Sequence, residues 1–125
     1  MTRPRVLVVE DDPGLRLALE HGLDAEGFDV AVAPDADAGC RRAAEVRPDL
    51  VLLDWGLPDG DDGTAACRRL LRAHPRGQVV MLTGRSEPEA ERAALAAGAR
   101  AFITKGIALD ALAAELRRVL ASASG

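Results

Sequence analysis

The chain has 125 residues, of which 48% are hydrophobic and 29% charged, and its formal net charge is −4. This size suits one domain with its own core, the apolar stretches are too short to span a bilayer, and the 16 basic residues form no long run that would indicate nucleic-acid binding. Because residues 1–4 also lack the apolar segment of a secretory signal, we expect a cytoplasmic domain over residues 1–125, with its core from about residue 5 to 120.

The pattern along the chain alternates strand and helix five times. Short apolar runs between turn residues are typical of buried parallel strands, and apolar residues three and four apart are typical of helices that cover a sheet. In chain order, the sequence predicts a strand over Arg5–Val9, a helix from Pro13 that Gly27 ends, a strand over Asp29–Ala33, a helix over Ala36–Val46, a strand over Leu50–Leu53, a helix ending near Ala73, a strand over Gln78–Thr83, a helix over about Glu87–Ala97, a strand over Ala101–Thr104, a helix over about Leu109–Leu120 and a frayed tail from Ser122. Asp12 and Asp35 are expected to cap the first two helices.

Five such units predict an α/β fold: a doubly wound five-stranded parallel sheet with helices on both faces, because right-handed crossovers alternate sides. The second strand begins with a charged residue, Asp29, which is typical of a sheet edge. The third is apolar throughout and therefore central. The flavodoxin-like order 2-1-3-4-5 follows, and sheets of this order bind ligands at the switch point between strands 1 and 3.

Acidic residues follow both strands that flank this switch point. Glu10 and Asp11 come after the first strand, and Asp54 directly follows the third. Carboxylates about 4 Å apart repel by about 4 kcal/mol at an effective dielectric near 20, so a convergent set must take up protons or draw in a cation. Mg²⁺ takes such oxygen ligands. The alternative is that Glu10 and Asp11 only accompany a helix cap and that Asp54 only ends a strand.

Three residues at strand ends fit phosphoryl chemistry. The carboxylate of Asp54, at the centre of the rim, can act as a nucleophile toward phosphorus. Lys105 is the only lysine, and its compact ammonium suits one phosphoryl oxygen. The hydroxyl of Thr83 suits another, although taken alone Thr83 is more simply an ordinary strand-end hydroxyl.

The segments VLVVEDDPGLR, LVLLDWGLP, VVMLTGRS and GARAFITKG together resemble the receiver domain of two-component response regulators. The resemblance covers about Arg5 to Leu120. It implies a Mg²⁺-dependent phosphoacceptor, with roles assigned by position: Asp54 as phosphoacceptor and metal ligand, Asp11 as direct metal ligand, Glu10 as a ligand through water, Gly56 as a ligand through its backbone carbonyl, Thr83 and Lys105 as phosphoryl contacts, and Phe102 as the switch aromatic.

The same resemblance implies a mechanism and partners. A histidine kinase or phosphotransfer protein would pass its phosphoryl group to Asp54. Thr83 would move toward that group and Phe102 would turn inward, which would repack the face formed by the fourth helix, fifth strand and fifth helix. An output domain or partner protein would read this face. On this interpretation the chain is no enzyme, and catalyses only its own phosphorylation and dephosphorylation.

Two departures from the family pattern leave local structure open. Receivers commonly carry proline after the lysine, whereas this chain has Gly106, and the segment Leu57–Gly63 is one residue longer than usual.

Three other function classes fit the sequence less well. An aspartyl-nucleophile phosphatase would carry a second acid two residues beyond the nucleophile, where Gly56 stands, and a flavin carrier would need more than 2% aromatics. A degenerate receiver that binds its partner without phosphorylation is disfavoured by Asp54, Thr83 and Lys105 together.

Overall fold

The computed structural model describes residues 3–56, 63–74, 76–84 and 88–124. Its centre is a parallel sheet in the order β2-β1-β3-β4-β5, as predicted. The strands are β1 (Arg5–Val9), β2 (Asp29–Ala33), β3 (Leu50–Asp54), β4 (Gln78–Thr83) and β5 (Ala101–Thr104). The helices are α1 (Pro13–Ala25), α2 (Ala36–Val46), α3 (Gly63–Ala73), α4 (Pro88–Ala96) and α5 (Leu109–Ser124).

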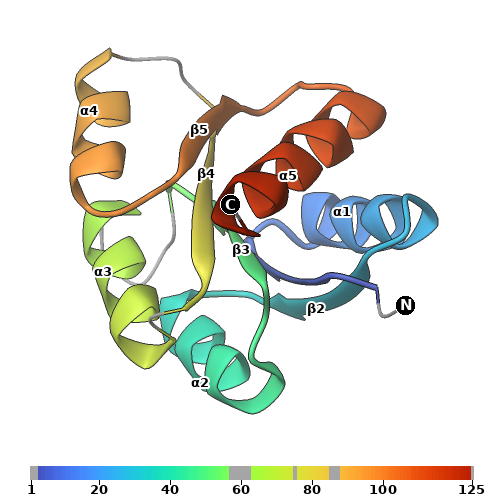
Figure 1. The fold of residues 1–125 in the computed structure, drawn as a ribbon, viewed down its shortest axis with the longest axis horizontal. Coiled ribbons are helices and arrows are strands. Elements are labelled where there is room, and N and C mark those ends of the chain that lie inside the picture. Colours follow the sequence, from blue (N-terminus) through green and yellow to red (C-terminus); the bar gives the residue numbers. More distant parts are fainter. Residues whose placement is uncertain (1–2, 57–62, 75, 85–87, 125) are drawn as a thin grey trace.

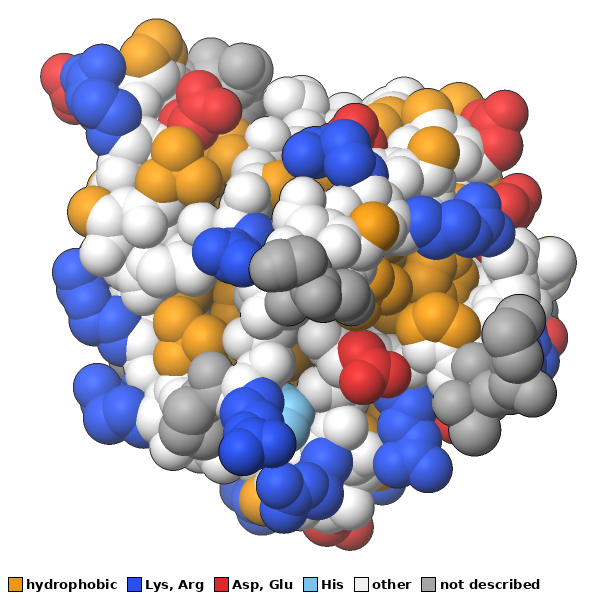
Figure 2. Space-filling model, in the orientation of Figure 1, with side chains coloured by type: hydrophobic (Ala, Val, Ile, Leu, Met, Phe, Trp, Pro, Cys, Tyr) orange, Lys and Arg blue, Asp and Glu red, His pale blue; other side chains and the backbone are white. Residues whose placement is uncertain are grey.

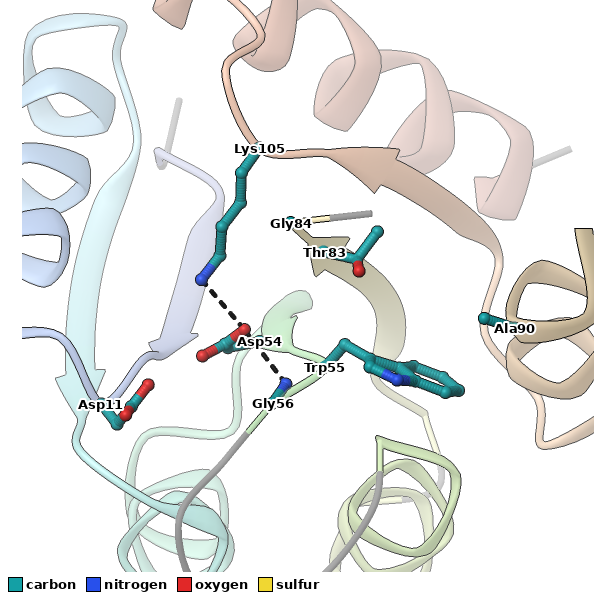
Figure 3. A pocket seen from close by; sticks show the side chains of 8 residues that line it. All are labelled: Asp11, Asp54, Trp55, Gly56, Thr83, Gly84, Ala90 and Lys105. Carbon is teal, nitrogen blue, oxygen red and sulfur yellow. Dashed lines mark hydrogen bonds and ion pairs between the residues drawn. The ribbon is translucent and has the colours of Figure 1, made fainter. Parts of the chain in front are cut away.

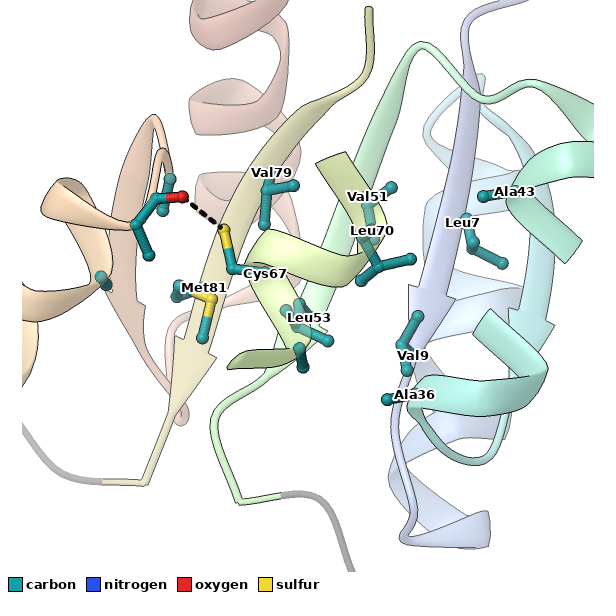
Figure 4. Packing of buried hydrophobic residues seen from close by; sticks show 14 of the residues in the cluster. Leu7, Val9, Ala36, Ala43, Val51, Leu53, Cys67, Leu70, Val79 and Met81 are labelled. Carbon is teal, nitrogen blue, oxygen red and sulfur yellow. Dashed lines mark hydrogen bonds between the residues drawn. The ribbon is translucent and has the colours of Figure 1, made fainter. Parts of the chain in front are cut away.

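The helices form two layers, with α1 and α5 on one face of the sheet and α2, α3 and α4 on the other (Figure 1). Alternation along each strand builds both interfaces, because successive side chains point to opposite faces. In β1, Val6 and Val8 pack toward α1 and α5, whereas Leu7 and Val9 pack toward α2 and α3. Figure 4 shows the hydrophobic cluster that contains Leu7 and Val9. The carboxyl ends of β1 and β3 are thereby fixed side by side.

Local signals fix the helix starts as expected. An oxygen of the Asp12 side chain accepts a hydrogen bond from the Gly14 N–H at 3.3 Å, and Asp35 accepts one from the Ala38 N–H at 2.8 Å. Gly27 follows α1 with φ of 101°, a value that glycine adopts without strain. These bonds satisfy N–H groups that a helix leaves without internal partners.

Two expectations about element bounds were wrong. Asp54 is the last residue of β3 rather than the first beyond it, because β4 continues opposite and Asp54 pairs with Leu82. The expected frayed tail is helical through Ser124, where alanines, the residue type with the highest helix propensity, alternate with the serines. α4 covers Pro88–Ala96, close to the expected helix, while Glu87 and most of the longer segment Leu57–Gly63 lie outside the described residues.

The surface carries charges of both signs. Figure 2 shows basic side chains spread around one face of the molecule among acidic and hydrophobic ones. Within the described residues, every helix is too short or too polar to cross a bilayer. The absence of nucleic-acid binding by this domain stays a prediction.

Candidate functional site

A cleft of about 440 Å³ opens at the carboxyl ends of the central strands. Figure 3 shows Lys105 reaching from the end of β5 toward Asp54, with Asp11 and Trp55 on opposite sides of that carboxylate. The cleft is lined by Asp11, Asp54, Trp55, Gly56, Thr83, Gly84, Ala90 and Lys105. The structure therefore brings residues from five separate segments of the chain to the switch point.

The loop after β1 presents two acids in different surroundings. The Glu10 N–H still donates to the Ala33 carbonyl at 3.0 Å, which keeps Glu10 at the edge of the sheet. The Glu10 side chain is buried, and its Oε2 accepts a hydrogen bond from the Asp12 N–H at 3.1 Å. Asp11 is exposed and lines the cleft. One carboxylate is thus held inside while its neighbour faces solvent.

Asp54 occupies the centre of the site. It is 5% exposed, and its Oδ1 accepts a hydrogen bond from the Gly56 N–H at 3.2 Å. The same oxygen lies 3.1 Å from Lys105 Nζ. These contacts orient a carboxylate that remains open to the cleft.

A single ammonium bridges two buried acids. Lys105 Nζ lies 3.2 Å from Glu10 Oε1 and 3.1 Å from Asp54 Oδ1. The Lys105 backbone N–H also bonds the Thr83 carbonyl, which ties the end of β5 to the end of β4. One positive charge therefore faces two buried carboxylates.

The pKa values of these three groups are set first by burial and then by their hydrogen bonds and charged neighbours. Burial raises the pKa of Glu10 to about 7, and the nearby charge of Asp54 adds to the effect. Burial also acts to raise the pKa of Asp54, but hydrogen bonds with Asp11 and Lys105 outweigh it and lower that pKa. The pKa of Lys105 is raised, because its two acidic partners outweigh the cost of burial. Of these two acids, Glu10 is therefore the one whose protonated form the metal-free site favours.

The acidic cluster fits a hard divalent cation. Glu10, Asp11 and Asp54 each offer an oxygen within 4.8 Å of the others. Among the described residues the buried Glu10 Oε1 makes no hydrogen bond of acceptable geometry, although Lys105 Nζ lies 3.2 Å away. A cation near these oxygens would supply the missing positive charge.

The remaining predicted site residues lie at or near the cleft. Thr83 is 4% exposed and lines it. Gly56 meets Asp54 through its N–H. Phe102 is half-buried beside the cleft, where its ring packs against Trp55 with centroids 5.9 Å apart. Trp55, the neighbour of Asp54 in sequence, also lines the cleft, so its indole is placed to report on the site.

The turn after Lys105 is formed by a glycine with a positive φ angle. Gly106 adopts φ of 98°, and all the described peptide bonds are trans. A glycine therefore provides a backbone conformation that a proline could not adopt.

A family model described as the response regulator receiver domain matches residues 6–117. The chain is 38% identical over 120 residues to the phosphate regulon transcriptional regulatory protein PhoB of Rhizobium meliloti. It is 41% identical over 115 residues to the DNA-binding response regulator MtrA of Mycolicibacterium smegmatis. These matches cover 94% and 92% of this chain but 52% and 50% of the two relatives, so the chain spans about half the length of the curated relatives it matches.

Solved structures share the fold over nearly the whole chain. A CheY-like response regulator receiver domain protein from Methanospirillum hungatei superposes with a TM-score of 0.90 at 28% identity and covers 98% of each chain. The BeF3-activated N-terminal receiver domain of RstA from Klebsiella pneumoniae has a TM-score of 0.84 at 36% identity, covering 93% of this chain and 97% of its own.

Proposed function

Because the chain belongs to the receiver domain family of two-component response regulators, we propose that Asp54 accepts a phosphoryl group and thereby switches the surface that a partner reads. The observation that carries the proposal is the convergence of Asp54 with Lys105 and Asp11 in one cleft, with the buried Glu10 carboxylate beside them. The lowered pKa of Asp54 supports it, since the ionised carboxylate is the nucleophilic form.

The proposed step is a direct transfer. An ionised oxygen of Asp54 attacks the phosphorus of a phosphohistidine, so a P–O bond forms while the P–N bond breaks, and the imidazole leaves and takes up a proton. Lys105 Nζ, 3.1 Å from Asp54 Oδ1, is placed to pair with a phosphoryl oxygen as charge moves onto it. Thr83 lines the same cleft and offers its hydroxyl.

We propose that Glu10, Asp11, Asp54 and the Gly56 carbonyl hold Mg²⁺. When bound, the metal neutralises negative charge on the transferring phosphoryl oxygens. Glu10, the most enclosed of the three acids, is assigned contact through water, and the cleft-lining Asp11 is assigned direct contact. The protein's own part is to keep two further carboxylates beside the nucleophile.

The switch is assigned to Thr83 and Phe102. Thr83 ends β4 and Phe102 lies in the neighbouring β5, so movement of the first toward a phosphoryl group opens space beside the second. The face formed by α4, β5 and α5 would then repack, as bistable packed elements do when a new charge favours one state.

The partners follow from the family. Of the relatives named above, one is a transcriptional regulatory protein and the other a DNA-binding response regulator. A histidine kinase or phosphotransfer protein is therefore proposed as the phosphoryl donor, and an output domain or separate protein as the partner that reads the switched surface. The chain is proposed to catalyse only its own phosphorylation and dephosphorylation, in the cytoplasm. A receiver that signals without phosphorylation is not favoured, because Asp54 and Lys105 form the ion pair that such a protein could dispense with.

The test is phosphorylation followed by intact mass. With Mg²⁺ and a small acyl-phosphate donor, the chain is expected to gain one phosphoryl group, which hydroxylamine removes because it is an acyl phosphate. Asp54→Asn should gain none. Asp110→Asn, at an exposed site on α5, is the matched control and should label like the wild type. Full labelling of Asp54→Asn, or a label that resists hydroxylamine, would reject Asp54 as acceptor.

A further inference from the structure

One arginine contacts the backbone of the acidic loop rather than any of its carboxylates. Arg16 lies in the first turns of α1 and is half-buried. Its Nη1 donates to the Glu10 carbonyl at 2.9 Å and lies 3.5 Å from the Asp11 carbonyl. One guanidinium nitrogen therefore meets the main chain of both acids that flank Asp54.

The loop leaves the sheet at this point. The ladder of β1 ends at Val9, which pairs with Ala33 on one side and Leu53 on the other. The Glu10 N–H makes one more bond to β2, and from there the chain turns into α1. The partly buried Glu10 carbonyl, which lies beyond the ladder, needs another donor, and Arg16 Nη1 supplies it.

Arg16 is itself well anchored. Its backbone N–H donates to the Asp12 carbonyl at 2.9 Å, which is the first bond of α1, and Asp12 also caps the helix. The side chain then reaches back over the turn, as helical side chains do. The first turn of α1 and the end of β1 are thus joined by one planar donor group whose geometry is rigid.

We propose that Arg16 is a positioning residue: by bonding the carbonyls of Glu10 and Asp11, it holds their side chains at the separation from Asp54 that a divalent cation requires. The proposal rests on the proposed metal site and adds a residue to it that touches neither metal nor phosphoryl group. Outer contacts that orient ligands are worth about 10- to 100-fold in metal affinity.

The sign of the effect separates this role from two simpler ones. As a mere positive charge near three carboxylates, Arg16 would repel a cation, so its removal would tighten Mg²⁺ binding. As a mere anchor of α1, it would support folding, and its removal would lower stability without changing the Mg²⁺ dissociation constant. As a positioning residue, its removal weakens Mg²⁺ binding.

The experiment measures Mg²⁺ binding by Trp55 fluorescence and, independently, by the Mg²⁺ dependence of the thermal midpoint. For Arg16→Met we expect the Mg²⁺ dissociation constant to rise about tenfold. For Arg16→Lys we expect a smaller rise, because lysine keeps the positive charge and still offers a donor, although on a shorter side chain. Arg118→Met removes an exposed arginine of α5 that pairs locally with Glu115 and is the control, expected to bind like the wild type.

A dissociation constant that is unchanged or lower in Arg16→Met overturns the proposal while leaving the metal site intact. Should that variant fail to fold, Arg16→Gln, with one amide donor on a shorter side chain, decides by the same criterion. A wild-type chain that binds no Mg²⁺ in either measurement overturns both the metal site and the role of Arg16.

Discussion

The indole of Trp55 lies edge-on against the ring of Phe102, with centroids 5.9 Å apart and ring planes at 73°. Trp55 follows Asp54 in sequence and lines the cleft, while Phe102 belongs to β5. The absence of a side chain at Gly63 makes room for the indole of Trp55. A Cβ at Gly63 would lie 2.7 Å from Met81 Cε and closer still to the indole. The ring pair therefore connects the end of β3, which carries Asp54, with β5, which carries the proposed switch residue Phe102.

A double-mutant cycle is expected to detect this contact. Trp55→Leu and Phe102→Leu should each lower the free energy of unfolding, with a coupling energy of about 0.5–1.5 kcal/mol, typical of edge-to-face aromatic pairs. Urea unfolding measures all four proteins. The same cycle between Trp55 and Phe28, which lies in the other core cluster, should be additive within about 0.5 kcal/mol. Additivity of Trp55 with Phe102 would show that the rings are only neighbours.

The raised pKa of Glu10 predicts an unusual pH dependence of the metal-free protein. Between its ordinary value of 4.5 and about 7, the folded chain holds a proton on Glu10 that the unfolded chain has lost. The free energy of unfolding therefore falls as pH rises through this window. Since one pKa unit corresponds to about 1.4 kcal/mol, the shift of Glu10 from 4.5 to about 7 limits its contribution to the fall to about 3–4 kcal/mol.

Glu10→Gln is the matching variant, because it resembles the protonated acid and cannot ionise. The stability difference between wild type and variant, from urea unfolding in chelator at pH 5, 6 and 7, should change in favour of the variant as pH rises. The lowered pKa values of Asp37, Asp54 and Glu115 act below about pH 4.5, outside this window. Parallel pH profiles would contradict the assignment of the proton to Glu10.

Lys105→Met should strengthen Mg²⁺ binding, whereas Arg16→Met should weaken it, although both substitutions remove a positive charge. The Lys105 ammonium contacts Glu10 and Asp54 directly and competes with a cation for them. Its removal should lower the Mg²⁺ dissociation constant about tenfold. Two unit charges 4 Å apart interact by about 4 kcal/mol at a dielectric near 20, and a tenfold change requires about a third of that energy. The metal-free protein should lose stability, because two buried acids lose their counter-ion.

The check is a fluorescence titration with Mg²⁺, beside Arg41→Met, an exposed arginine on α2, as control. Weaker binding in Lys105→Met would mean that the lysine organises the carboxylates more than it competes for them.

Gly106→Ala should lower the free energy of unfolding by about 1–2 kcal/mol, the cost of a left-handed backbone for a residue with a Cβ. The cost is conformational, because a Cβ at Gly106 would meet nothing within 4 Å among the described residues. Gly14→Ala in the first turn of α1 is the control, where the new Cβ would lie 3.8 Å from Asp12 Oδ1 and the substitution should be neutral or stabilising. Equal stability of Gly106→Ala and wild type in urea would contradict this account.

The fold was predictable because its signals are local. Apolar runs identified all five strands, the charge at Asp29 marked the edge, and Asp12 and Asp35 capped the helices that they precede. Strand ends were less certain: Asp54 belongs to β3 because β4 is long enough to pair with it, and the length of a partner strand is not encoded beside the residue itself.

The site was predictable as a set of residues but not as a set of contacts. Strand order alone brings Asp11, Asp54 and Lys105 to one rim. That Lys105 bridges Glu10 and Asp54 depends on the rotamer of a long side chain and on the burial of Glu10, which arise only from packing. Arg16 had no distinguishing signal among 15 arginines, because its partners are backbone carbonyls and any arginine could serve.

The modest anchoring of α4 has a consequence for motion. Within its bounds α4 buries one side chain, the methyl group of Ala94, and leaves Leu95 47% exposed, whereas α5 buries Leu112, Ala113, Leu116 and Val119. Local opening costs least where the fewest apolar atoms are returned to water. Amide hydrogens of α4 should therefore exchange with solvent sooner than those of α5, so the molecule can reshape this edge while the rest of its interior stays intact.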